Sequence, residues 1–315
     1  MKNSQMKFVI CTPRNLHGGV IALHELCRRL YNNGYDAKIF YSDYMKCYNP
    51  VSFWIIWAGL TLLDSLQALL VKYHFKIKLN KNSDIYTSRS LAGCKRKYLP
   101  FVNKDTIVIY PDIAYGNFLN AKRVIRYLLY FNHYDMSAYG KDDLVISYSN
   151  DYIDEKLNPE HRVASTPYFD LELYKQTNYS ERKGACYLIW NGRNRNDLPT
   201  YFEGTVIDNL SEAEKVRVLN ESKYLYSYDE MSAYNSIACL CGCIPIIVPE
   251  EGRTLESYRK PGLEHYGVAI GDSDEQIEYA RNTREELIKI YDRVPERAQS
   301  GTEKFITYCQ DFFGQ

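Results

Sequence analysis

Two stretches of the chain combine apolar runs with helical spacing, which is the pattern of a β-α-β unit. The first consists of an apolar run, a helical pattern and a second run at Lys7–Thr12, Val20–Asn33 and Tyr35–Tyr41. The second repeats that order at Tyr224–Tyr226, Met231–Cys241 and Ile244–Val248. Continuous apolar runs are typical of parallel strands buried on both faces. The pattern therefore predicts two parallel sheets, each with helices packed against it.

The remaining elements follow from shorter patterns. Further strands are predicted at Ile85–Thr87, Thr106–Tyr110, Tyr127–Phe131, Leu144–Ser147 and Gly184–Gly192. Helices are predicted at Asn117–Arg126, Ser211–Ser222, Asp274–Val294 and Glu296–Phe313. Ser211 and Glu214 have the spacing of a capping box, which marks the start of their helix. Gly34 ends the first helix as a left-handed cap.

The chain has 315 residues, which is enough for two domains. The order of elements predicts an α/β fold with two Rossmann-like domains that face a cleft. We place the first domain at residues 1–167 and the second at residues 168–294. Residues 295–315 are predicted to form a C-terminal helix that crosses back to pack on the first domain.

Composition and charge narrow the class of function. Lys plus Arg equals Asp plus Glu at 39 each, so the net charge is zero. A neutral chain argues against a nucleic-acid binder that works by neutralising phosphates. The 30 tyrosines reflect either a compositional bias or aromatic platforms for sugar rings.

The nine cysteines are odd in number, and several lie in apolar segments. The first predicted strand begins at Lys7, so no secretory leader is expected. We therefore expect a reduced protein of the cytoplasm without a disulfide framework. Cys239, Cys241 and Cys243 alternate without a flanking histidine, which favours apolar packing over a metal site.

The segment Val51–Val71 is the most membrane-like part of the chain. Asp64, Ser65 and Gln67 interrupt its second half, so a core helix or a helix on a membrane surface is favoured over a spanning one. The expected location is the cytoplasm, with peripheral association at the inner face of the membrane left open.

Two motifs resemble those of the GT-B glycosyltransferases. His17–Phe40, HGGVIALHELCRRLYNNGYDAKIF, resembles the glycine-containing loop and helix that open many of these enzymes. Ser222–Glu250, SKYLYSYDEMSAYNSIACLCGCIPIIVPE, resembles their donor-binding β-α-β unit. Together with YPDIAYGNFLNAKRVIRYLLYF at Tyr110–Phe131, they look like transferases of bacterial surface polysaccharides such as capsule and O-antigen.

The resemblance has one departure. Many retaining members carry two glutamates in the helix region of the donor unit. Glu230 matches the first, but Ala238 stands at the second position. The choice between a retaining and an inverting reaction therefore stays open.

Candidate donor-binding residues follow the strands of both predicted units. Without a metal, a leaving diphosphate is neutralised by cationic side chains and helix N-terminal amides. The candidates for donor contact are Gly18, Gly19, Arg193, Arg195, Tyr228, Asp229, Glu230, Ser232 and Asn235. No metal ligand and no cofactor are expected. The plain alternatives are a solvated loop for the arginines, an N-cap for Ser232 and a tight turn for the glycines.

The acceptor hydroxyl needs a general base. Asp112 follows the strand TIVIYP and is the first candidate; the others are His17, His133 and Asp135. Acceptor contacts are expected from Tyr115, Asn117, Asn120 and His133. For any one histidine, a structural role is favoured over a catalytic one.

The resemblance implies a hexosyltransferase that uses a nucleotide sugar, with a UDP-sugar favoured. Its partners are this donor and a glycan or lipid-linked glycan acceptor, and no nucleic acid is expected. One alternative is a nucleotide-sugar epimerase of the same architecture. Another is a non-catalytic subunit that binds a partner transferase.

Overall fold

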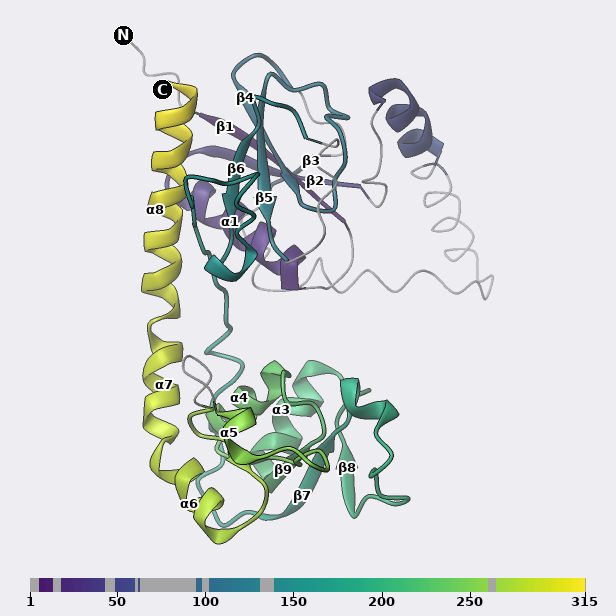
Figure 1. The fold of residues 1–315 in the computed structure, drawn as a ribbon, viewed down its shortest axis with the longest axis vertical. Coiled ribbons are helices and arrows are strands. Elements are labelled where there is room, and N and C mark those ends of the chain that lie inside the picture. The colour runs from purple at the N-terminus through teal and green to yellow at the C-terminus, as the bar shows by residue number, and fades with distance from the viewer. Residues whose placement is uncertain are drawn as a thin grey trace. The chain divides into compact units, whose positions relative to one another are not determined.

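The structure is a computed structural model (Figure 1) and describes residues 6–13, 18–42, 49–59, 62, 95–97, 102–130, 139–259 and 265–314. Internal contacts divide the chain into two compact units. The first consists of Met1–Tyr168 and Pro295–Gln315, and the second of Phe169–Val294. Each unit is an α/β fold around a parallel sheet, so the predicted pair of Rossmann-like domains is confirmed.

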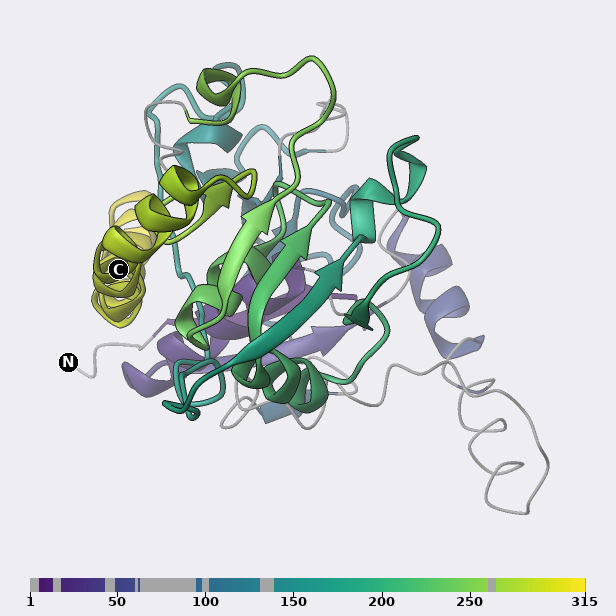
Figure 2. The ribbon, with the colours of Figure 1, turned by 90° about the horizontal axis from the view of Figure 1, so that it is seen from below.

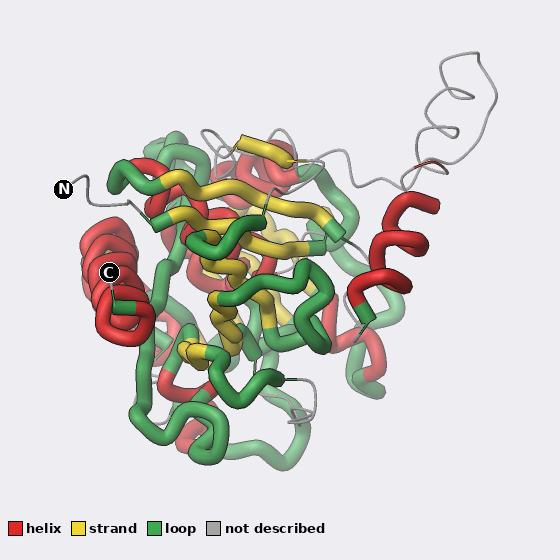
Figure 3. Tube along the Cα trace, turned by 90° about the horizontal axis from the view of Figure 1, so that it is seen from above, coloured by secondary structure: helices red, strands yellow, loops and turns green. Residues whose placement is uncertain are grey.

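The sheet of the first unit has six strands, and Figure 3 draws the strands of the chain in yellow. Their spatial order is β3 (Lys95–Lys97), β2 (Asp36–Tyr41), β1 (Lys7–Thr12), β4 (Thr106–Pro111), β5 (Arg123–Leu128) and β6 (Leu144–Ser147). All neighbouring pairs are parallel. This is the strand order of the dinucleotide-binding fold. All six residues of β4 are buried, as expected of a central strand covered on both faces.

Two helices cover the core of this sheet. In α1 (Gly18–Asn32), Leu23, Leu26 and Leu30 recur at helical spacing and are buried. Gly34 has a φ of +89°, and the helix ends there as predicted. The long helix α8 (Val294–Phe313) adds Phe305 to the same core and lies beside this sheet in Figure 1.

One predicted helix of the first unit is wrong. Asn117–Arg126 is a loop followed by the start of β5, and β5 begins four residues before the predicted strand Tyr127–Phe131. The cause is Arg126, which is fully buried although its side chain is charged. Its Nε donates to Asp143 over 2.7 Å, and its Nη1 and Nη2 donate to the carbonyls of Ala114 and Gly116. The predicted strand Ile85–Thr87 lies outside the described residues.

The membrane-like segment is described only in part. Residues 50–59 form a helix whose Phe53 stacks on Phe118 with ring centroids 4.1 Å apart. The ring centroid of Trp57 lies 5.8 Å from that of Phe40 in β2. In the described part of the chain, no helix is both long enough and apolar enough to span a membrane. The remainder of Val51–Val71, apart from Leu62, lies outside the described residues.

The sheet of the second unit has five parallel strands, seen side by side in Figure 2. Their spatial order is β11 (Ala269–Ile270), β10 (Ile244–Ile247), β9 (Ser222–Ser227), β7 (Lys183–Leu188) and β8 (Gly204–Val206). This is the strand order of flavodoxin-like doubly wound folds. The helices of the unit are α3 (Glu212–Glu221), α4 (Ala233–Leu240), α5 (Leu255–Tyr258), α6 (Asp274–Asn282) and α7 (Arg284–Asp292).

Local signals of the second unit were mostly interpreted correctly. The capping box of Ser211 and Glu214 is present at the start of α3. The predicted strand Gly184–Gly192 runs too far, because β7 ends at Leu188 and a 3-10 helix follows at Trp190–Asn194. The predicted helix Asp274–Val294 is broken into α6 and α7 at Thr283, whose Oγ1 accepts a hydrogen bond from the amide of Gly267.

Candidate functional site

Each sheet has a point where the strand order reverses, and open parallel sheets bind ligands outside the carboxyl ends of the strands there. In the second unit this point lies between β7 and β9, so the chain leaves adjacent strand ends after Leu188 and Ser227. In the first unit it lies between β1 and β4, after Thr12 and Pro111. These two sheet edges are the places to look for a site.

The loop after β7 is held by a carboxylate. Asp208 accepts hydrogen bonds from the amides of Ile189 and Trp190 at 3.0 and 2.6 Å. Gly192 then lies against the loop after β9, where an added Cβ would stand 2.3 Å from the Tyr228 carbonyl oxygen. Only glycine fits so close to another backbone, so the two loops form one packed edge.

Asp229 joins the same two loops from the other side. Its Oδ2 accepts a hydrogen bond from Asn191 Nδ2 over 3.0 Å, and the residue is 4% exposed. Its carbonyl oxygen accepts bonds from Ser227 Oγ and Asn235 Nδ2. The carboxylate of Asp229, predicted to contact the donor sugar, thus holds the two loops together in this structure.

The start of α4 combines a helix cap with an unsatisfied acceptor. Ser232 is the N-cap, and its Oγ accepts a hydrogen bond from the amide of Tyr234 over 3.2 Å. Asn235 is 3% exposed and donates from Nδ2 to the carbonyls of Asp229 and Glu230. Its Oδ1 is buried, and no hydrogen bond to it is found within the described residues.

A cavity of about 300 Å³ opens at this helix start. Its polar lining comes from the loop before α4, from α4 itself and from His265, and its apolar lining from Val268 and α7. The lining residues that carry the argument are Glu230, Ser232, Ala233, Asn235 and His265. Three predicted donor residues, Glu230, Ser232 and Asn235, are thus brought to one cavity within one unit.

The charges beside this cavity are paired. Arg253 Nη1 donates to Glu230 Oε2 over 2.7 Å, and Glu230 Oε1 lies 3.9 Å from His265 Nε2. Burial lowers the pKa of His265, while the negative charge of Glu230 acts to raise it. Its ring nitrogen Nε2 is buried without a hydrogen-bond partner in the described part of the chain. A neutral His265 is therefore the second lining residue of this cavity, after Asn235, with such a buried polar atom.

The two predicted arginines behave differently. Arg195 donates to both oxygens of Asp197 and to the carbonyls of Val248 and Pro249, so its guanidinium ties the loop after β7 to the end of β10. It also lies over the ring of Tyr228 at 5.1 Å. Arg193 is exposed and lies over the Trp190 ring at 5.0 Å. Of the two, Arg193 is the more available to an external anion.

A second and larger cavity, of about 530 Å³, lies in the first unit at its own reversal point. It is lined by the ends of β1 and β4, the start of α1 and a group of tyrosines: Pro13, Gly18, Gly19, Pro111, Asp112, Tyr130, Tyr148 and Tyr152. The predicted donor set is therefore divided. Gly18 and Gly19 line this cavity of the first unit, and the other seven residues belong to the second unit.

Asp112 is the carboxylate that lines this cavity of the first unit. Its Oδ2 accepts hydrogen bonds from the amides of Leu129 and Tyr130 at 3.2 and 3.0 Å. Burial raises the pKa of Asp112, and these amide hydrogen bonds offset part of the rise. A carboxyl with a raised pKa in a cavity has the properties of a general base or acid.

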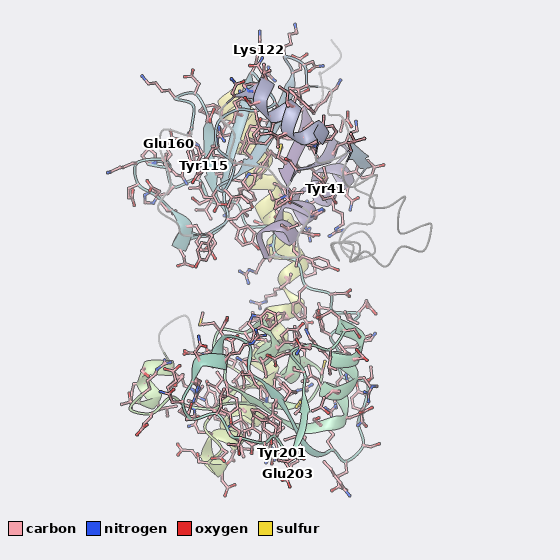
Figure 4. The ribbon with its side chains drawn as sticks, turned by 90° about the vertical axis from the view of Figure 1, so that its right-hand side faces the viewer. Tyr41, Tyr115, Lys122, Glu160, Tyr201 and Glu203 are labelled. Carbon is pink, nitrogen blue, oxygen red and sulfur yellow. The ribbon has the colours of Figure 1, made fainter. Side chains whose placement is uncertain are left out.

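The predicted acceptor residues follow β4. Asn117 Oδ1 accepts from Tyr110 Oη and the Ala121 amide, and its Nδ2 donates to the Ala121 carbonyl, so it shapes the loop. Asn120 is exposed at a φ of +51° and forms the turn. Tyr115 is half-buried in the first unit, where Figure 4 labels it. His17 and His133 lie outside the described residues.

Three functional candidates escaped the sequence analysis: Arg253, His265 and Asp208. They lie in loops after β10, before β11 and after β8, and no motif surrounds them. The positive φ of +52° at His265 and the burial of its side chain are properties of the folded chain only. Among the described residues, no group of His, Cys, Asp and Glu is arranged to hold a metal ion.

Comparison with known proteins finds similarity among solved structures only. No protein-family model and no curated protein matches the chain. A glycosyltransferase of kitacinnamycin is 9% identical with a TM-score of 0.42, covering 98% of this chain and 99% of its own. An alpha-glucosyltransferase in complex with UDP and a 13-mer DNA is 14% identical with a TM-score of 0.43, covering 96% of each chain. The spinosyn rhamnosyltransferase SpnG, complexed with thymidine diphosphate, is 10% identical with a TM-score of 0.35, covering 96% of each chain. A similarity this distant identifies no residue, substrate or acceptor.

Proposed function

We propose that the protein is a glycosyltransferase that binds the nucleoside diphosphate of its sugar donor at the start of α4. The observation that carries this proposal is the cavity there, which is lined by a helix N-terminus, by Glu230 with its partner Arg253 behind it, and by Asn235 and His265. Asn235 and His265 each have a buried polar atom that finds no hydrogen-bond partner among the described residues. The first amides of a helix have no acceptor within the helix and attract anions. The resemblance of Ser222–Glu250 to a donor-binding unit supports the same placement.

The roles divide by chemistry. The amide of Ala233, at the first position of α4, and the guanidinium of Arg253 suit the diphosphate oxygens. Asn235 Oδ1 and the Nε2 of a neutral His265 suit the hydroxyl groups of the ribose or the donor sugar. A buried polar atom without a partner costs about 1–3 kcal/mol, so a ligand that supplies hydroxyl donors recovers that cost. Asn235 Oδ1 and His265 Nε2 are inaccessible to solvent in this structure. Each side chain must therefore rotate slightly for its atom to reach a ligand in the cavity.

The leaving diphosphate is stabilised in this proposal by side-chain and backbone donors without a metal ion. Arg253 is held by Glu230 before the donor arrives, so its charge is already oriented. Arg193 supplies a second guanidinium at the same sheet edge. In the first unit, Asp112 is the proposed base that takes the proton of the acceptor hydroxyl as the acceptor oxygen attacks the sugar. The nucleoside diphosphate leaves with the electrons of the bond that breaks.

The substrate assignment extends the same proposal. A UDP-hexose is the proposed donor, and a glycan of a bacterial surface polysaccharide is the proposed acceptor. These assignments rest on the resemblance of the donor unit and of Tyr110–Phe131, and they are tested separately from nucleotide binding.

The first experiment is a thermal-shift panel of UDP, GDP, CDP, ADP and TDP with EDTA present, repeated with Mg²⁺. A ligand that binds only the folded protein raises the melting temperature with its concentration. The proposal predicts a shift with one nucleotide that EDTA does not remove. No shift with any nucleotide contradicts it.

Turnover separates the proposal from its alternatives. With the matching nucleotide sugar and no acceptor, slow release of free sugar is expected from a transferase. Conversion of the sugar to its epimer would identify an epimerase, and nucleotide binding without any turnover would identify a non-catalytic subunit.

A further inference from the structure

The helix at residues 50–59 carries an apolar face that no described part of the chain covers. Val51 is 67% exposed, Ile55 is 68% exposed and Leu62 is 62% exposed. Val51 and Ile55 are four residues apart and therefore share one face of the helix. In the sequence, no charged residue occurs from Val51 to Leu63.

The opposite face of this helix fixes its orientation. Phe53 is fully buried and stacks on Phe118, while Trp54 and Trp57 lie 6.2 and 5.8 Å from the ring of Phe40. The aromatic side chains therefore anchor the helix to β2, and the aliphatic side chains are the ones presented outward. The helix lies on the side of the first unit opposite α8 (Figures 1 and 3).

The sequence that follows this helix is strongly basic. Residues 65–104 contain nine Lys and Arg and a single acidic residue, Asp84, in a chain whose net charge is zero. Three of these basic residues form the edge strand β3, which pairs with β2 so that Lys97 stands opposite Phe40. Phe40 is also the residue on which the helix packs. The apolar helix and a basic strand thus adjoin the same strand of the sheet.

We propose that this part of the first unit docks on an anionic lipid surface, with Val51, Ile55 and Leu62 entering the boundary between headgroups and acyl chains. Such binding combines buried apolar area with attraction of basic residues to anionic headgroups, and both components are present here. A nucleic acid would account only for the basic residues, since its phosphates make no favourable contact with aliphatic side chains. A second copy of the chain satisfies only the aliphatic face, since two net basic segments repel each other.

The experiment uses the full chain and vesicles of phosphatidylcholine, with and without phosphatidylglycerol. Co-sedimentation is expected with the anionic vesicles, and added salt is expected to weaken it. Val51→Glu with Ile55→Glu lowers the partition coefficient by at least about tenfold. The control is Tyr201→Glu, which replaces a 78% exposed side chain of the second unit (labelled in Figure 4) and leaves vesicle binding unchanged.

Two further measurements distinguish a loss of vesicle binding from unfolding of the variant and from binding to another partner. Because the replaced side chains are exposed, the melting temperature of the double variant stays at that of the wild type, and Val51→Ser with Ile55→Ser replaces it if the charged variant unfolds. The proposal is overturned if the wild-type protein binds to neither kind of vesicle. It is also overturned if the double variant binds to the anionic vesicles as well as the wild type does. A loss of self-association in the double variant, or displacement from vesicles by an oligonucleotide, assigns the surface to another partner and also overturns it.

Discussion

Arg253 donates a hydrogen bond to Glu230 across 2.7 Å at the edge of the α4 cavity. The two side chains come from different loops of the second unit, before and after β10. The pair holds a guanidinium in place while cancelling most of its charge. A diphosphate must therefore compete with Glu230 for Arg253. Because of this competition, replacing Glu230 and replacing Arg253 are expected to change nucleotide affinity in opposite directions.

Glu230→Gln is predicted to tighten nucleoside diphosphate binding, because it leaves Arg253 in place and removes the competing negative charge. Arg253→Ala is predicted to weaken binding by about tenfold or more, the usual size of a hydrogen bond to a charged group. Calorimetric titration of both variants with the nucleotide found in the thermal-shift panel measures these changes. The exposed pair of Arg217 and Glu221, also 2.7 Å apart, supplies the matched control Arg217→Ala, which leaves affinity unchanged.

Asp112→Asn is predicted to gain stability relative to the wild type as the pH rises from 4 to 7. Burial raises the pKa of Asp112 above its usual 3.8, so the folded protein holds this proton more tightly than the unfolded chain does. The resulting stability is complete below the unfolded value and is lost as the pH rises through the folded one. Asparagine does not ionise and is spared this loss.

The measurement is the difference in melting temperature between variant and wild type across that pH range. For units of this size, each 1 kcal/mol corresponds to about 2–4 °C. Asp142→Asn, at an exposed position of the first unit, serves as the control for the substitution itself. A difference between Asp112→Asn and the wild type that stays constant from pH 4 to pH 7 contradicts the assignment of a buried, readily protonated carboxyl.

Gly301→Ala is predicted to lower the melting temperature, although alanine normally stabilises a helix interior by about 1 kcal/mol over glycine. Gly301 lies in α8 where an added Cβ would stand 1.8 Å from the carbonyl oxygen of Ser165. The methyl group must push α8 away from the backbone at Ser165, which costs about 1–3 kcal/mol as overpacking. Ser300→Ala, at the exposed neighbouring position, leaves stability nearly unchanged. Equal melting temperatures for both variants contradict this close packing.

The elements that sequence predicted well are those with local causes. The capping box at Ser211 depends on residues within one turn, and the apolar run of β10 needs no distant partner. The failures have distant causes. From the sequence, the charge of Arg126 favours an exposed position on a helix. In the fold it lies in a strand, where its guanidinium donates hydrogen bonds to Asp143 and to the carbonyls of Ala114 and Gly116.

The same division holds for the candidate site. Glu230, Ser232 and Asn235 were predicted because the α4 motif surrounds them in the sequence. His265 lines the cavity and Arg253 pairs with Glu230 at its edge, each from a separate loop, and no sequence motif surrounds either residue. The hydrogen bond between Asp229 and Asn191 joins two separate loops, so it could not be predicted from the sequence around either residue.

The central claim is that the amide at the start of α4 binds the donor diphosphate, and Ala233→Pro tests it most directly. Ala233 is exposed at the first position of the helix, where proline is tolerated, and Ser232 before it already has the extended φ and ψ of −70° and 133° that proline requires. The substitution therefore removes one N–H and keeps the helix. Titration of wild type and variant with the nucleoside diphosphate in EDTA is predicted to show a loss of about tenfold in affinity at an unchanged melting temperature. Equal affinity in the two folded proteins would contradict the claim.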